Sequence, residues 1–199
     1  MSIIVKNATG STELTSTSAT NDVITLPSGT GTLLKTDGDG SGLTGIGAGK
    51  MLQVVNLVYS TQSSMTIAAT DTAITGMNLS ITPVGAGSKF RIDVRLFGEA
   101  PTTYNHVFNI HRDGVRINSA AGNFNGLAMA AITYEASDNS TTPEMLDFST
   151  VDSTGSAVGT AITYTLVGSG FSVTQWINRC FSVSGETGVS EIIITEIGA

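Results

Sequence analysis

The stretch FRIDVRL, from Phe90 to Leu96, places apolar and charged side chains at alternate positions. Successive side chains of a β-strand point to opposite faces, so this two-residue period is that of a half-buried strand. Downstream, two further strand-like runs flank Asp113-Gly114. Both of these residues tolerate positive φ, so the dipeptide predicts a tight β-hairpin.

Other strands are expected at residues 52–59, 72–82, 127–134, 146–151, 161–167, 179–183 and 189–197. Residues 126–136 are also compatible with a helical turn. Eight or nine strands in about 150 residues, without a clear helix, predict an antiparallel β-sandwich of the jelly-roll type.

The composition supports strands and excludes several functions. Charged residues are 13% of the 199, about half the usual share, and glycine is abundant at 23. The net charge of −7 argues against nucleic-acid binding, which depends on Lys and Arg. We expect no membrane insertion and no signal peptide, since no run of about 18 apolar residues and no secretion layout is found. The single cysteine, Cys180, excludes an intramolecular disulfide.

Two regions differ in chemistry. Residues 1–49 contain no aromatic residue and 25 Ser, Thr or Gly, whereas all aromatics occur from Tyr59 onward. A segment without large side chains buries too little area to order itself alone. We therefore predict an extended stem and attachment segment at 1–49, ordered by packing against other copies, and a β-sandwich head at 50–199.

The stem ends in a glycine-rich stretch that resembles a ligand loop. Gly40 to Gly45 match the pattern G-x-G-x-x-G, but a dinucleotide loop requires a following helix. Asp37 and Asp39 have the spacing of a calcium loop, yet Ala48 occupies the position of the closing glutamate. A loose cation site at Asp37 and Asp39 stays a weak alternative to a polar turn, and we expect no cofactor.

Catalytic groupings are sparse. His106 and His111 are five apart in a predicted strand and point to opposite faces, so they cannot share a metal. Cys180 fits a buried core position. No carboxylate pair has the arrangement needed for glycoside hydrolysis. The sequence therefore predicts a protein that is not an enzyme.

Two stretches combine an aromatic ring with amides, as sugar-binding surfaces do. The candidate ligand-binding residues are Tyr104, Asn105, Trp176 and Asn178. The alternative is that Trp176 fills a core and Tyr104 closes a strand end.

The stretch VITLPSGTGTLLKTDGDGSGLTGI, residues 23–46, resembles a connector of bacteriophage tail fibres and related virion fibres. The stretch from Gly49 to Gly98 and the ending VSEIIITEIGA are similar to the fibre-tip domain of that family. The resemblance implies a homotrimer with a thin stem and three sandwich heads, located in the virion after assembly in the host cytoplasm.

We therefore expect a phage structural fibre protein whose head recognises a host-surface glycan. Residues 1–49 would contact other virion proteins. The alternative is a capsid decoration or head-fibre protein held to the capsid by that same segment.

Overall fold

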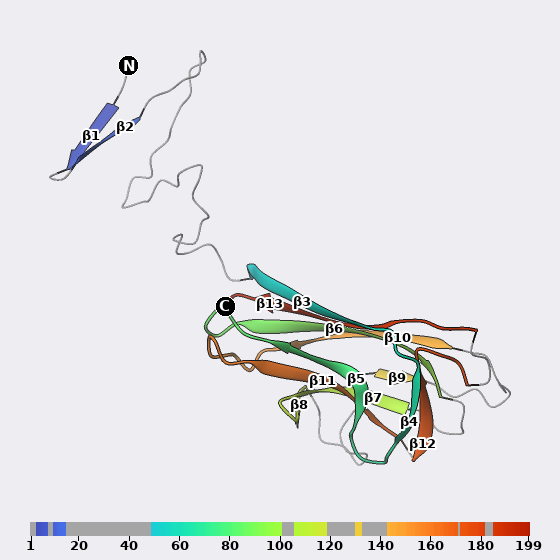
Figure 1. Ribbon diagram of the computed structural model, residues 1–199. Coiled ribbons are helices and arrows are strands. Elements are labelled where there is room, and N and C mark those ends of the chain that lie inside the picture. The colour runs from blue at the N-terminus through green and yellow to red at the C-terminus, as the bar shows by residue number, and fades with distance from the viewer. Residues whose placement is uncertain are drawn as a thin grey trace. The chain divides into compact units, whose positions relative to one another are not determined.

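The computed structural model describes residues 3–7, 10–14, 49–100, 106–118, 130–132, 143–170, 172–181 and 185–199. The chain divides into two compact units, Met1–Gly45 and Ile46–Ala199. In the first unit, β1 (Ile3–Asn7) and β2 (Gly10–Leu14) pair antiparallel (Figure 1). The connector that carries Asp37 and Asp39 lies outside the described residues.

The second unit is a sandwich of two antiparallel sheets (Figure 1). The sheet here called the β6 sheet has the order β3 (Met51–Tyr59), β13 (Ser190–Ile197), β6 (Lys89–Glu99) and β10 (Glu144–Asp152). The β7 sheet has the order β5 (Thr72–Ile81), β11 (Ile162–Ser169), β7 (His106–Arg112) and β8 (Val115–Arg116), and β9 (Ala130–Ile132) also pairs with β7.

This strand order is that of a jelly roll. Taken without the short β8, and without β12 (Val173–Ile177) and β4 (Ser63–Ile67), which extend the β6 sheet at one end, the sheets read β3-β13-β6-β10 and β5-β11-β7-β9, so that most connections pass from one sheet to the other. Eight strands in two such sheets form the double Greek key of that fold. The all-β sandwich predicted from the sequence is confirmed, and no helix occurs among the described residues.

The core lies between the two sheets. Phe90 and the other apolar members of the Phe90–Leu96 series are fully buried, whereas Arg91 and Arg95 are exposed, as the alternation predicts. Phe108, Ile110, Tyr164 and Leu166 cover them from the β7 sheet. The rings of Phe90 and Tyr164 lie 6.0 Å apart between centroids. Burial of these large side chains is the main stabilising term of the head.

The predicted hairpin joins β7 to β8. Asp113 and Gly114 have φ of 49° and 83°, so both turn residues are left-handed. This is the backbone of a type I′ turn, whose twist matches that of the flanking strands. The prediction from Asp-Gly is confirmed.

A two-stranded ribbon at one end of the sandwich was not expected from the sequence. β4 (Ser63–Ile67) pairs with β12 (Val173–Ile177), and the end of β12 continues onto β6 at Gly98 and Glu99. The strand expected at 179–183 is wrong for its described part, since residues 179–181 form an isolated bridge and a bend. The segment 126–136 includes strand β9 rather than a helical turn in its described residues.

Candidate functional site at the end of β12

Three side chains form an aromatic and cationic cluster where β12 ends. Gln175 and Ile177 are fully buried, so Trp176 between them points to the opposite, outer side of the ribbon. Its ring meets that of Phe181 edge to face, with 5.7 Å between the centroids. The guanidinium carbon of Arg179 lies 4.6 Å from the Trp176 ring centroid. We call these three residues the Trp176 cluster.

Phe181 provides the accessible ring of the cluster. It is 44% exposed, whereas Trp176 and Arg179 are half-buried. Arg179 donates its Nε hydrogen to the carbonyl of Cys180 at 3.1 Å, and within the described residues this is the only hydrogen bond of its guanidinium. Its Nη groups make no hydrogen bond within the described residues.

Backbone contacts hold the cluster in place. The amide of Phe181 donates to the buried carboxylate of Glu99 at 2.5 Å. Gly98 lets β12 approach β6, since a Cβ at that position would lie 2.1 Å from the carbonyl oxygen of Trp176. A rigid support of this kind keeps both rings oriented before any ligand arrives.

Asn178, a candidate ligand-binding residue, lies in the interior. Its side-chain amide donates to the carbonyls of Tyr59 at 2.8 Å and Thr61 at 3.1 Å, and its oxygen accepts from Ser190 at 2.7 Å. The backbone is left-handed, with φ of 58°. Asn178 is fully buried and turns the chain out of β12, which makes its role structural.

Of the remaining candidate ligand-binding and cation-site residues, only Trp176 lies in the described part of the chain. Trp176 belongs to the cluster at the surface, while Tyr104, Asn105, Asp37 and Asp39 lie outside the described residues. Phe181 was not among the candidates, because it was expected to belong to an apolar strand at 179–183. The sequence nonetheless contained a signal for Phe181. Asn178, a residue type that can end a strand, stands three positions before it, and Arg179 lies between them.

The two histidines face opposite sides of β7, as their odd spacing predicts. His106 is fully buried, and its Nδ1 lies 2.6 Å from Oε1 of Gln175. Since the Gln175 amide nitrogen donates to the carbonyls of Glu99 and Trp176, Oε1 accepts and His106 Nδ1 donates. Burial lowers the pKa of His106, and the Gln175 hydrogen bond only partly opposes it. Its Nε2 is buried without a partner among the described residues.

Cys180, between Arg179 and Phe181 in the chain, is fully buried. Burial, together with the hydrogen bond from its thiol to Glu186 at 3.3 Å, raises its pKa to about 11. The thiol is therefore protonated at neutral pH and unsuited to act as a nucleophile. The core position expected for this residue is confirmed.

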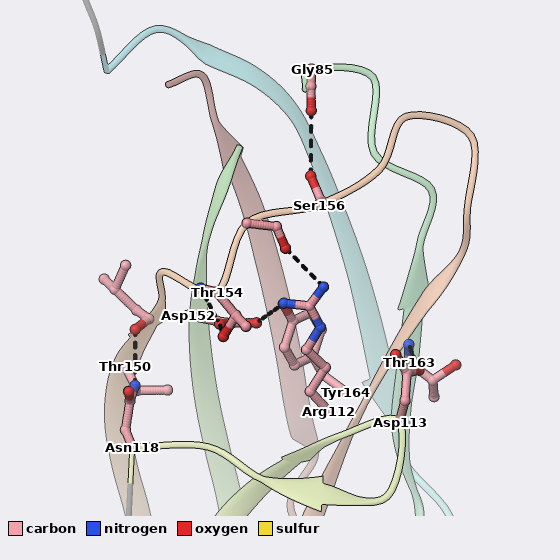
Figure 2. A network of polar contacts seen from close by, with 12 residues as sticks. Gly85, Arg112, Asp113, Asn118, Thr150, Asp152, Thr154, Ser156, Thr163 and Tyr164 are labelled. Carbon is pink, nitrogen blue, oxygen red and sulfur yellow. Dashed lines mark hydrogen bonds and ion pairs between the residues drawn. The ribbon is translucent and has the colours of Figure 1, made fainter. Parts of the chain in front are cut away.

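The buried Asp152 is enclosed by donors rather than open to a ligand (Figure 2). It accepts from Arg112 Nη1 at 2.8 Å, the Tyr164 hydroxyl at 2.7 Å and the Thr154 amide at 2.9 Å. Burial alone would raise its pKa, but the hydrogen bonds from Thr154 and Tyr164 outweigh it and lower the pKa. Burial and the adjacent carboxylate raise the pKa of Tyr164.

The carboxylates of Asp71 and Glu196 likewise accept hydrogen bonds from donors within the chain. Asp71 binds Ser169 and His111, each at 2.7 Å, and also Arg116. The aspartate stands between Ser169 and His111, so the three do not form the Ser-His-Asp relay of a hydrolase. Glu196 accepts from the amide of Gly85 at 2.8 Å. Burial alone would raise the pKa of both carboxylates, but their hydrogen bonds lower it.

No group of three or more potential metal ligands was found within the ranges that the structure describes. A helix long and apolar enough to cross a membrane was likewise not found there. The chain matches no known family model and no curated protein. The arrangement at the end of β12 is therefore the described feature best suited to contact a ligand, through ring stacking and guanidinium donors.

Proposed function

We propose that this chain is a non-enzymatic structural protein of a bacteriophage virion fibre whose head recognises a bacterial surface glycan. The observation that carries the proposal is the Trp176 cluster. An exposed ring packs well against the apolar face of a sugar, and a guanidinium donates to its hydroxyl or carboxylate oxygens. Phe181 would provide the ring, Arg179 the donors, and Trp176 would support both.

The architecture supports the same proposal. Jelly rolls are common among viral capsid and lectin domains. Residues 23–46 and 189–199 resemble connector and tip segments of phage fibres. In this function residues 1–49 attach the chain to other virion proteins, and the chain is a homotrimer. Three weak sites carried on one particle gain strength through effective concentration.

A glycan array probed with the full chain tests the recognition step. Wild type is expected to bind a small set of bacterial glycans, and Phe181→Ala is expected to lose most of that signal. Val158→Ala is the control, since Val158 is also an exposed apolar residue but lies in the loop between β10 and β11. Absence of binding, or binding unchanged in Phe181→Ala, would overturn the proposal.

The separate N-terminal unit, Met1–Gly45, also suits a capsid decoration or head-fibre protein that clamps capsid subunits. Gold-labelled antibody against the head distinguishes the two functions on intact virions. Label at the tail favours the host-binding fibre, whereas label at regular positions on the capsid favours decoration.

A further inference from the structure

The two outer faces of the sandwich differ in character. Of the ten large hydrophobic side chains that are exposed in the described residues, five lie on the edge strands of the β6 sheet. They are Met51, Val54 and Val58 on β3, and Met145 and Val151 on β10. On the described strands of the β7 sheet only Val115, on the short β8, is of this kind.

The β7 sheet presents a polar outer face instead. Asn78 and Ser80 of β5 are exposed, and Thr163, Thr165 and His111 follow in the same layer. Ser80 and Thr163 share a hydrogen bond of 2.8 Å between their hydroxyls. Hydrogen bonds within the chain satisfy several of these polar groups, as expected for the solvent side of a sheet.

Charged residues lie on β6, β13 and β10 of the outer β6-sheet face. Lys89, Arg91 and Arg95 are matched by Asp93, Asp147 and Glu191, which gives +3 − 3 = 0. Arg95 contacts both Asp147 and Glu191, at 3.2 and 3.8 Å. The whole chain carries −7, so most of its surface repels an identical copy, whereas this face does not.

We propose that the outer face of the β6 sheet is the surface through which copies of this chain associate. One cross-strand row of this sheet runs Val54, Thr195, Arg91 and Val151, with the two apolar side chains on the edge strands and the two polar ones between them. Because this face has no net charge, the outer β6-sheet faces of two copies can come into contact without net electrostatic repulsion. This inference rests on the self-association included in the proposed function, but not on glycan recognition.

Sedimentation velocity of the full chain across micromolar concentrations tests the surface. Wild type is expected to be oligomeric, and Val54→Asp is expected to raise the dissociation constant about tenfold or more, because it buries an unpaired charge. Val158→Asp is the matched control, since the two valines are 50% and 56% exposed and only Val54 lies on the face. Equal far-ultraviolet circular dichroism spectra establish that both variants fold.

Hydrogen exchange of the wild type at low and high concentration gives an independent reading. Protection of β3 and β10 that rises with concentration supports the inference. A monomeric wild type would overturn both the inference and the proposed trimer. An oligomer that Val54→Asp leaves intact, with concentration-independent exchange in β3 and β10, would overturn the inference alone. Glycan binding can fail without affecting either result.

Discussion

The guanidinium of Arg179 lies over the indole ring of Trp176, with 4.6 Å between its central carbon and the ring centroid. A cation in this position is attracted to the ring by about 0.5–2 kcal/mol, depending on solvent access. The same indole ring also contacts Phe181, with 5.7 Å between the ring centroids. A ligand therefore meets a surface that is already assembled.

Removal of Phe181 should expose the indole. Trp176 is the only tryptophan of the chain, so tryptophan emission, excited at a wavelength that tyrosine does not absorb, reports on this site alone. Phe181→Ala is expected to shift the emission maximum to longer wavelength, because water replaces the ring against Trp176. Val115→Ala, at an exposed valine of β8, should leave the spectrum unchanged. Identical spectra for wild type and Phe181→Ala would contradict the described packing.

A methyl group at Gly98 should separate β12 from β6. The added Cβ would lie 2.1 Å from the carbonyl of Trp176, so Gly98→Ala is expected to lower the free energy of unfolding by about 2–3 kcal/mol. Gly155→Ala is the control, since nothing lies within 4 Å of its Cβ position and its left-handed φ of 78° costs only about 1 kcal/mol. Urea denaturation measures both variants. Equal losses would show that β12 can move away from β6 at little cost.

His106 should make the head less stable in mild acid. Its pKa in the fold lies below the ordinary 6.5, so the unfolded chain binds a proton first as the pH falls. The free energy of unfolding therefore decreases from about pH 7 toward pH 5, by at most about 1.4 kcal/mol per pH unit. The stabilising contributions of Asp71, Asp152 and Glu196 are lost only in the lower carboxylate range, because their pKa values are lowered.

Urea denaturation at several pH values compares wild type with His106→Gln. The variant is expected to be less stable at pH 8, since it loses the bond to Gln175, but to have a flatter dependence between pH 7 and 5. Parallel curves would exclude His106 as the source of the acid sensitivity.

Loss of Asp152 should leave the half-buried guanidinium of Arg112 without its carboxylate partner, with only the hydrogen bond to the Gly155 carbonyl retained. The carboxylate is 1% exposed, and Asp152→Ala is expected to cost about 3–5 kcal/mol in unfolding free energy. Asp147→Ala removes an aspartate that pairs with Arg95 at 60% exposure, and should cost less than about 1 kcal/mol. A small effect at Asp152, seen by the same denaturation, would mean that water reaches Arg112.

The central strands were predictable because their signals are local. The alternation from Phe90 to Leu96 and the Asp113-Gly114 turn are explained by side-chain period and backbone preference alone. The β4–β12 ribbon was missed, since its two strands are short and only their pairing orders them. The strand expected at 179–183 is wrong in its described part, residues 179–181, because the left-handed backbone of Asn178 ends β12 and redirects Arg179 over Trp176.

The candidate site was predictable only where residue type alone was sufficient to select a side chain. Trp176 could be selected by residue type, but the burial of Asn178 and the exposure of Phe181 follow from that single backbone reversal. A sequence pattern shows that asparagine tolerates left-handed φ, not that it adopts it.

The most direct test of glycan recognition is the emission of Trp176 during titration with purified bacterial surface polysaccharides. At least one polysaccharide is expected to change the emission in a saturable way, and Phe181→Ala should weaken that binding about tenfold or more. If no polysaccharide changes the emission, or if binding detected by calorimetry leaves Trp176 unaffected, the head does not recognise glycans through this site.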